Sequence, residues 1–325
     1  MQEEEKRVSG PTRRIKQIVE SEAATGEVTD VNVLLRRPDW IRGKLPSPHL
    51  TGPTRDIVRS HGLHTVCEEA RCPNLGECWQ KRHATMMILG DTCTRSCGFC
   101  AIKTGRPNEL DWDEPRRVGE AVADLGLRHV VITSVNRDEL LLGGADIFAA
   151  TIIEIRKLSP ETRIEVLTPD FKAYAPALKI CFDARPDVFN HNVETVPRLY
   201  YKVRPQAIYQ RSLDVLKAGK DAGLITKSGI MVGLGETNEE VIEVLKDLRA
   251  HHCDMLTIGQ YLQPTKEHLP VSRFVTPAEF DEFARVAHEL GFGSVASGPM
   301  VRSSYNAEEF FERSKVKVLL ERNRL

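Results

Sequence analysis

The sequence lacks an excess of charge of either sign. Its 325 residues include 45 Lys and Arg and 46 Asp and Glu, so the formal net charge is −1. Proteins that hold nucleic acid through its phosphates depend on a basic surface or stripe. With hydrophobic residues at 41% and charged residues at 28%, the composition is that of an ordinary globular protein. We therefore expect no nucleic-acid partner.

Long apolar runs are also missing. A membrane helix needs roughly 18 consecutive apolar residues, and no stretch of the chain approaches this length. The first residues, MQEEEKR, contain no apolar signal core and are too acidic for a typical transit peptide. We expect no membrane partner and a cytoplasmic protein; an organelle stays open if a targeting segment was removed.

Cysteine is the exception, and its distribution is uneven. Six of the eight cysteines lie in two triplets, namely Cys67, Cys72 and Cys78, then Cys93, Cys97 and Cys100. In a reducing compartment such spacing favours metal ligation over disulfides. A structural zinc site is normally closed by four ligands, and neither triplet has a fourth cysteine nearby, so zinc is the weaker interpretation. An iron-sulfur cubane held by three thiolates keeps one iron open for chemistry.

The second triplet resembles the cluster loop of the radical S-adenosylmethionine (SAM) enzymes. It reads C-x3-C-x2-C, has Phe99 before its last cysteine and follows the apolar run at residues 85–89. The resemblance implies a 4Fe-4S cluster on Cys93, Cys97 and Cys100, whose open iron binds SAM and which generates a 5′-deoxyadenosyl radical. The alternative is a structural metal site or three free thiols.

The first triplet narrows the resemblance to the members of this family that insert sulfur. C-x4-C-x5-C before the SAM loop agrees with them, as do the stretches TSVNRD at 133–138, HNVET at 191–195, VGLGET at 232–237 and RSSY at 302–305. The similarity extends from about Val31 to about Ala307. It implies a second 4Fe-4S cluster, here called the auxiliary cluster, on Cys67, Cys72 and Cys78, completed by Ser304, with Ser303 as the alternative.

The same resemblance implies an activity. It is the insertion of two sulfur atoms at C6 and C8 of an octanoyl chain linked to a carrier lysine, with two SAM consumed and the auxiliary cluster as sulfur donor. The C–H bonds at C6 and C8 are unactivated, and no side-chain acid or base can break them at neutral pH, so the reaction requires a radical supplied by a cofactor. The implied carriers are octanoylated lipoyl domains of 2-oxoacid dehydrogenase complexes and the glycine-cleavage H protein. An electron donor of the ferredoxin or flavodoxin type and an iron-sulfur carrier that rebuilds the cluster are implied as further partners.

Two other functions stay open at this point. One is a different two-cluster radical SAM enzyme, such as a methylthiotransferase, against which the chain shows no tail domain suited to RNA. The other is a non-enzymatic iron-sulfur protein, whose clusters would be fully ligated.

Strand-like and helix-like stretches alternate after residue 84. Short apolar runs at 85–89, 129–135, 163–168, 188–193, 226–232 and 255–259 are typical of buried strands. Between them, stripes such as Val241, Val244, Leu245 and Leu248 follow helical spacing. The alternation predicts an α/β fold with a parallel sheet, and the resemblance favours a partial (β/α)6 TIM-like barrel.

The expected organisation has four parts. Residues 1–30 form a mobile polar arm, 31–83 an extension with the auxiliary cysteines, 84–300 the radical SAM barrel and 301–325 a C-terminal extension with the RSSY motif. Prolines between residues 36 and 54 predict an irregular extended segment, followed by a short helix at 56–62. Cys181 and Cys253 lie in apolar patterns and are interpreted as core residues.

Polar residues at the ends of predicted strands are the candidates for holding SAM. Ser134 and Asn136 end the second predicted strand, and Asn192 and Glu194 end the fourth. Phe99 of the cluster loop and Arg204, which stands before Pro205, complete the set. An amide or carboxylate can bind the ribose hydroxyls, and a guanidinium suits the methionine carboxylate. The family's Gly-Gly-Glu after the second strand is absent, because Gly143 and Gly144 are followed by Ala145, so the ligands of the amine stay open.

Overall fold

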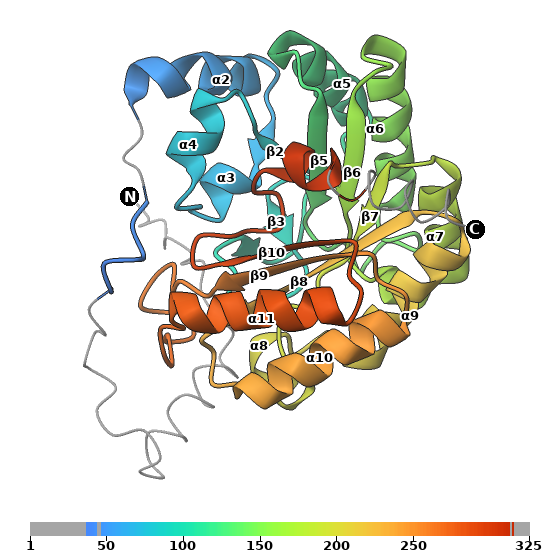
Figure 1. Cartoon of the computed structure of the whole chain (residues 1–325). Helices are drawn as coiled ribbons and strands as arrows, with labels where there is room; N and C mark the ends of the chain where they lie inside the picture. Colours follow the sequence, from blue (N-terminus) through green and yellow to red (C-terminus); the bar gives the residue numbers. More distant parts are fainter. Residues whose placement is uncertain (1–36, 44–46, 313, 315–325) are drawn as a thin grey trace, which may run out of the picture.

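The computed structural model describes residues 37–43, 47–312 and 314. Its centre is an eight-stranded sheet in the order β1-β2-β5-β6-β7-β8-β9-β10 (Figure 1). The strands are β1 (His64–Thr65), β2 (Thr85–Ile88), β5 (His129–Ser134), β6 (Arg163–Leu167), β7 (Val188–Asn190), β8 (Ile225–Val232), β9 (Met255–Gln260) and β10 (Ser294–Gly298). Neighbouring strands from β2 to β10 are parallel, and β1 alone pairs antiparallel with β2.

The sheet confirms the predicted fold class. All six predicted strands are present, and β1 and β10 form the two edges, so within the described chain the barrel stays open between them. Neither edge strand was predicted. β10 reads SVASG and is only partly buried, because an edge strand has one neighbour and needs no continuous apolar run.

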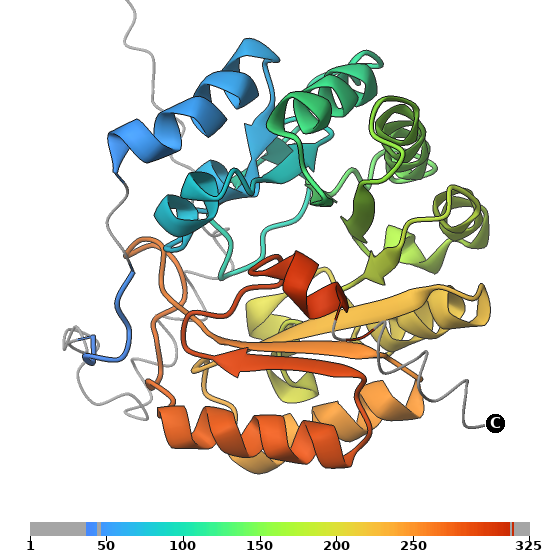
Figure 2. The ribbon, with the colours of Figure 1, turned by 45° about the horizontal axis from the view of Figure 1, so that its top comes forward.

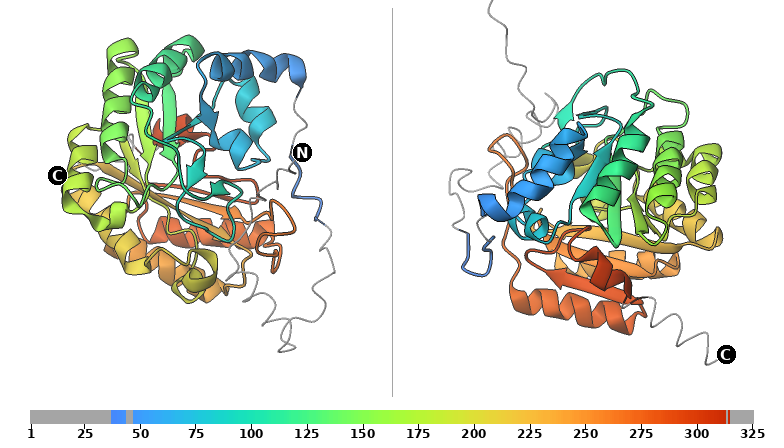
Figure 3. Two further views of the ribbon diagram at one scale, coloured as in Figure 1. Left: turned by 180° about the vertical axis from the view of Figure 1, so that it is seen from behind. Right: turned by 90° about the horizontal axis from the view of Figure 1, so that it is seen from above.

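Helices cover the outer face of the curved sheet (Figures 2 and 3). They are α5 (Glu114–Leu125), α6 (Ala145–Leu158), α7 (Ala175–Asp183), α9 (Tyr209–Asp221), α10 (Asn238–Ala250) and α11 (Pro277–Glu289). The predicted stripe on α10 is buried. α10 and α11 each begin with a capping box, Thr237 with Glu240 and Thr276 with Glu279, in which side chains satisfy the free N–H groups of the first turn.

The extension before the barrel is more helical than predicted. It contains α2 (Pro48–Ser60), α3 (Val66–Glu69) and α4 (Leu75–Gln80). The expected extended segment was wrong from Pro48 on, and the helix predicted at 56–62 is present but begins eight residues earlier. Pro48 occupies the first turn, where a missing N–H costs nothing, and burial of Thr51, Thr54 and Val58 holds the helix together despite Pro53. The predicted arm at residues 1–30 lies outside the described residues.

The last described segment, residues 299–312, returns through the barrel. The segment begins at the carboxyl end of β10. Its Phe310 and Phe311 pack on Val188 and Met255, which are the first residues of β7 and β9, so the segment crosses to the amino ends of the strands. Figure 2 shows this red segment between the strands β8–β10 and the other half of the sheet. It therefore fills space inside the open barrel.

Cys181 and Cys253 are fully buried, each in one of the two large hydrophobic cores. Their interpretation as core residues is confirmed. Among the described helices, none is long and apolar enough to cross a membrane.

Candidate functional site

The second cysteine triplet lies in the loop after β2, at the carboxyl edge of the sheet. Cys93 stands on β3 (Thr92–Cys93), which pairs with β4 (Lys103–Thr104). The Sγ of Cys93 accepts hydrogen bonds from the backbone N–H of Asn136 at 3.2 Å and of Arg95 at 3.4 Å. Such N–H donors stabilise a thiolate and tune a cluster bound to it.

Arg95, between Cys93 and Cys97, fastens this loop to the barrel. Its guanidinium is buried and donates to both carboxylate oxygens of Asp138, at 2.7 and 2.9 Å, and to Asp170 at 2.6 Å. Burial alone would raise the pKa of Asp170, but the hydrogen bonds and charge of Arg95 lower it well below its usual range. Asp138 lies in the loop after β5 and Asp170 in the loop after β6, so Arg95 connects the cluster loop to two neighbouring strand ends. Sequence reasoning missed this clamp, although both aspartates follow predicted strands.

Burial raises the pKa of two thiols of this loop, Cys97 and Cys100. It raises the pKa of Cys97 to about 11, against an opposing effect of Arg204, and it raises the pKa of Cys100 further, with a contribution from Cys97. These thiols are protonated at neutral pH in the metal-free protein. Metal binding must therefore displace protons, as is general for cysteine sites.

Several candidate SAM contacts have buried polar atoms without a partner. Within the described chain, Ser134 Oγ, Asn192 Oδ1 and Arg204 Nε have no hydrogen-bond partner. Such atoms are nearly always paired in native proteins, so they fit a site that receives a polar ligand.

Glu194 adds strain to this region. Its backbone is left-handed at φ 67°, and its carboxylate accepts from Asn192 Nδ2 at 3.0 Å. Burial raises the pKa of Glu194, and Arg204 opposes the shift. Left-handed backbone at a non-glycine residue is costly and concentrates at functional sites.

The candidates do not all meet at one place. Phe99, Asn192 and Glu194 line a cavity of about 430 Å³ together with Cys100. Ser134 and Arg204 lie outside its lining, and Arg204 donates to the backbone oxygen of Asn192 at 2.8 Å. Asn136 lines a separate surface hollow between residues 136 and 176.

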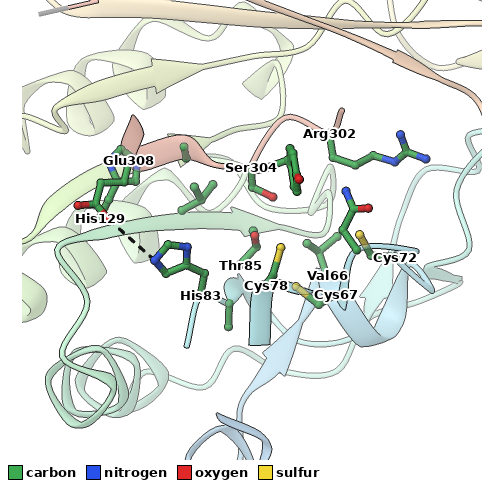
Figure 4. A pocket seen from close by; sticks show the side chains of 15 residues that line it. Val66, Cys67, Cys72, Cys78, His83, Thr85, His129, Arg302, Ser304 and Glu308 are labelled. Carbon is green, nitrogen blue, oxygen red and sulfur yellow. Dashed lines mark ion pairs between the residues drawn. The ribbon is translucent and has the colours of Figure 1, made fainter. Parts of the chain in front are cut away.

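The first triplet surrounds a smaller cavity of about 40 Å³ (Figure 4). Cys67 stands on α3, Cys78 on α4 and Cys72 between them, and Ser304 lines the same cavity from the far end of the chain. Burial raises the pKa of Cys78 to about 12, and the neighbouring Cys67 and Cys72 raise it too. The three sulfurs are thus close enough to affect one another. Among the described residues, no three Cys, His, Asp or Glu side chains converge on a single-ion site.

Potential hydrogen-bond donors lie near the sulfur of Cys67. Burial raises the pKa of Cys67, and the nearby Thr85 and Trp79, as potential donors to the sulfur, oppose the shift. The indole N–H of Trp79 is buried and has no hydrogen-bond partner within the described chain, so it is free to donate to a bound group. Trp79 is fully buried in the core next to α3. Donors of this kind are the usual surroundings of a thiolate that binds a metal or cluster.

The segment that carries Ser304, residues 299–305, is hydrogen-bonded both to the extension that carries the first triplet and to the barrel. Asn74 donates to the backbone oxygen of Met300 at 2.7 Å, and the Tyr305 hydroxyl donates to Glu77 at 3.2 Å. On the barrel side, Asn192 Nδ2 donates to Ser303 Oγ at 2.7 Å. Ser304 lines both cavities, whereas Ser303 lines only the larger one.

The larger cavity joins the two triplets. Cys72 lies in its wall together with Cys100, and apolar side chains such as Met231, Leu262 and Val301 make up much of the rest. An apolar cavity with a few polar groups is the usual form of a small-molecule site. The arrangement can hold an apolar chain with one triplet on each side of it.

Comparison with known proteins gives matches over most of the chain. The family model described as the Radical SAM superfamily matches residues 87–248. A lipoyl synthase of Rubrobacter xylanophilus is 58% identical over 281 residues, covering 86% of this chain and 88% of its own. One of Alcanivorax borkumensis is 59% identical over 276 residues, covering 84% and 85%.

Solved structures share the fold at low identity. The maturase HydG superposes with a TM-score of 0.54 at 14% identity, covering 87% of this chain and 66% of its own. Streptococcus suis SuiB, bound to S-adenosylmethionine, gives 0.50 at 13%, covering 66% of this chain and 50% of its own. These two likenesses concern the fold alone.

Proposed function

The chain belongs to the lipoyl synthase family of the radical SAM enzymes, and from this premise we propose how its two cysteine triplets divide the work of sulfur insertion. Members of this family are sulfurtransferases that act on lipoyl-domain proteins and use a 4Fe-4S cluster with SAM. When bound, the SAM cluster would supply the electron that releases a 5′-deoxyadenosyl radical from SAM, and the auxiliary cluster would supply sulfur. The protein itself supplies ligands, orientation and exclusion of water.

Cys93, Cys97 and Cys100 hold the SAM cluster in this proposal. The N–H groups on Cys93 and the Arg95 clamp keep the loop in one conformation. Asn192 and Glu194, with Phe99 beside them, bind the ribose or methionyl end of SAM. Ser134, Asn136 and Arg204 lie outside the lining of the larger cavity and are assigned to the same ligand as outer contacts. The unpaired atoms of Ser134, Asn192 and Arg204 favour this assignment for these three residues.

Cys67, Cys72, Cys78 and Ser304 hold the auxiliary cluster. The observation that carries this assignment is that Ser304 lines the cavity of the three thiols, while the hydroxyl of Ser303 is held by Asn192 outside it. A serine oxygen is a harder ligand than a thiolate and matches iron less well in a sulfur-rich cluster. Ser304 would therefore hold its iron more weakly than Cys67, Cys72 and Cys78 hold theirs.

The cavity of about 430 Å³ between the triplets accommodates the octanoyl chain. Its apolar wall matches an alkyl chain and keeps water from a carbon radical. Access to both triplets from one cavity explains how hydrogen removal and sulfur insertion act on the same carbons. The carriers are the lipoyl domains of 2-oxoacid dehydrogenases and the glycine-cleavage H protein, with a ferredoxin or flavodoxin as electron donor and an iron-sulfur carrier for repair.

The iron and acid-labile sulfide content of reconstituted protein tests the assignment. We expect about eight of each per chain, falling to about four when Cys67, Cys72 and Cys78 are all replaced by Ala. A Cys181→Ala variant is the control, because this thiol is buried in the core, and it keeps about eight. A count of about four in both the parent and the triple variant contradicts the auxiliary cluster.

A further inference from the structure

One lysine is completely buried inside the barrel. Lys227 lies near the start of β8, in a strand that is otherwise mostly apolar, and its side chain has no exposed area. Removing an ammonium from water carries a large free-energy cost unless the charge is paired and hydrogen-bonded. Such a residue therefore needs a structural or functional reason.

All three protons of the Lys227 ammonium have acceptors. Nζ donates to the two carboxylate oxygens of Glu165, at 2.9 and 3.1 Å, and to the backbone oxygen of Ser303 at 2.6 Å. The ring of Phe310 lies 5.1 Å from the nitrogen, a distance at which a cation and an aromatic ring attract each other. The contacts with Ser303 and Phe310 both come from the C-terminal segment.

The partner carboxylate is buried too. Glu165 on β6 accepts from Asn190 Nδ2 on β7 at 2.7 Å, and His129 on β5 lies 3.6 Å away. Burial alone would raise the pKa of Glu165, but Lys227 and His129 lower it to about 2. The Glu165 carboxylate is therefore ionised at neutral pH, and the pair is anchored in the successive strands from β5 to β8.

The contact with Ser303 matters because Ser304 is the next residue in the chain. The oxygen that Lys227 holds belongs to the peptide between Ser303 and Ser304, and Asn192 holds the hydroxyl of Ser303 at 2.7 Å. Ser303 is thus fixed at its carbonyl and at its side chain. Ser304, directly after it, faces the cavity of the first cysteine triplet.

We propose that Lys227 is a positioning residue for the auxiliary cluster, whose ammonium holds the Ser303–Ser304 peptide so that the Ser304 hydroxyl reaches the iron. This inference rests on the proposed role of Ser304 as a ligand. The Lys227–Glu165 pair then serves the geometry of the cluster.

The test removes the contact without leaving a buried charge alone. Lys227→Met alone would strand the Glu165 carboxylate, so it is combined with Glu165→Gln, which keeps the acceptor for Asn190. Glu165→Gln alone keeps the contact of the ammonium with Ser303 but removes its carboxylate partner, so this variant measures the effect of an unpaired buried charge separately from the loss of the Ser303 contact. All variants also carry Cys93, Cys97 and Cys100→Ala, so that only the auxiliary cluster contributes to the spectrum.

The readout is the rate at which brief oxidation converts the auxiliary cluster to a three-iron form, followed by EPR. We expect conversion about tenfold faster in Lys227→Met/Glu165→Gln than in the parent, the effect of one lost hydrogen bond to a charged group. Ser304→Ala should be at least as fast. Glu165→Gln alone, and the conservative Lys227→Arg, should stay near the parent.

The outcomes separate the two proposals. If Ser304→Ala converts no faster than the parent, the ligand role of Ser304 is wrong and this inference falls with it. If Ser304→Ala converts faster than the parent but the double variant converts at the parent's rate, Lys227 does not position the serine. The ligand role of Ser304 then stands. Equal acceleration by Glu165→Gln alone also overturns the inference. If the double variant does not fold, Lys227→Gln/Glu165→Gln takes its place with the same expectation.

Discussion

His191 shows how burial sets the chemistry of a single side chain in this protein. The imidazole is enclosed after β7, where Nδ1 donates to the Thr168 oxygen at 2.9 Å and Nε2 accepts from the Ser212 hydroxyl at 3.0 Å. Burial, followed by the charge of Arg204, lowers the pKa of His191 to about 4. The ring is therefore neutral and acts as a fixed link between β6 and α9.

This link predicts a loss of stability in acid. The folded-state pKa of about 4 lies below the unfolded value of about 6.5, so below pH 6.5 the unfolded chain binds more protons. Stability falls as the pH is lowered from about 6.5 toward about 4, by about 1.4 kcal/mol per pH unit and about 3 kcal/mol in all. Urea unfolding at pH 7 and pH 5 should show a smaller loss in His191→Gln than in the parent. An identical loss in both proteins would exclude His191 as the cause.

At the scale of elements, the close contact between β9 and residues 299–305 places Ser304. A Cβ added to Gly259 would lie 2.2 Å from the backbone oxygen of Val301, a distance that only displacement of one backbone can relieve. Gly298 on the adjacent β10 also faces Val301, but a Cβ there would lie 3.5 Å from its side chain. A side chain at Gly259 would therefore displace the backbone, whereas a side chain at Gly298 would make an ordinary contact.

Gly259→Ala should displace this segment and weaken the auxiliary site more than the SAM site, although Gly259 also lines the larger cavity. We expect the auxiliary cluster to be largely lost, with about four irons left per chain, while reductive cleavage of SAM to 5′-deoxyadenosine continues. Iron analysis and product assay on the same sample measure both effects. Gly298→Ala is the matched control and should keep about eight irons. A Gly259→Ala protein with a full iron count would show that the segment adapts without moving Ser304.

On the scale of the whole molecule, the C-terminal segment compensates for an incomplete barrel. The sheet ends at β1 and β10 without closing in the described chain, and Phe310 and Phe311 cover Val188 and Met255 inside it. Phe310 also lies against the Lys227 ammonium. One segment thus contributes to the core and carries the serine of the auxiliary site, so stability and cluster binding are linked.

Phe310→Ala should accordingly destabilise the protein. Phe310 is 6% exposed, and truncation of a buried phenylalanine typically costs about 3 kcal/mol or more. The midpoint of urea unfolding measures the loss. Leu158→Ala, at a residue 49% exposed on α6, is the control and should change stability by less than about 0.5 kcal/mol. Equal small effects would mean that the segment does not contribute to the core.

The predictions from sequence succeeded where the signal was local. Apolar runs predicted the six inner strands, because a strand buried on both faces must be apolar along its length. The helical stripe on α10 was equally visible. The edge strand β10 and the proline-containing first part of helix α2, residues 48–55, were missed, because their stability comes from neighbours that lie elsewhere in the chain.

The sequence by itself determined the two cysteine triplets, the family and the order of strands and helices. Each of these depends on spacing within a short stretch or on identity with relatives. Only the tertiary structure decided that Ser304 shares a cavity with Cys67, Cys72 and Cys78, that one larger cavity joins both triplets and that Lys227 and Glu165 meet inside the barrel. These contacts join residues far apart in the chain, and packing of the whole sheet, rather than any local pattern, brings them together.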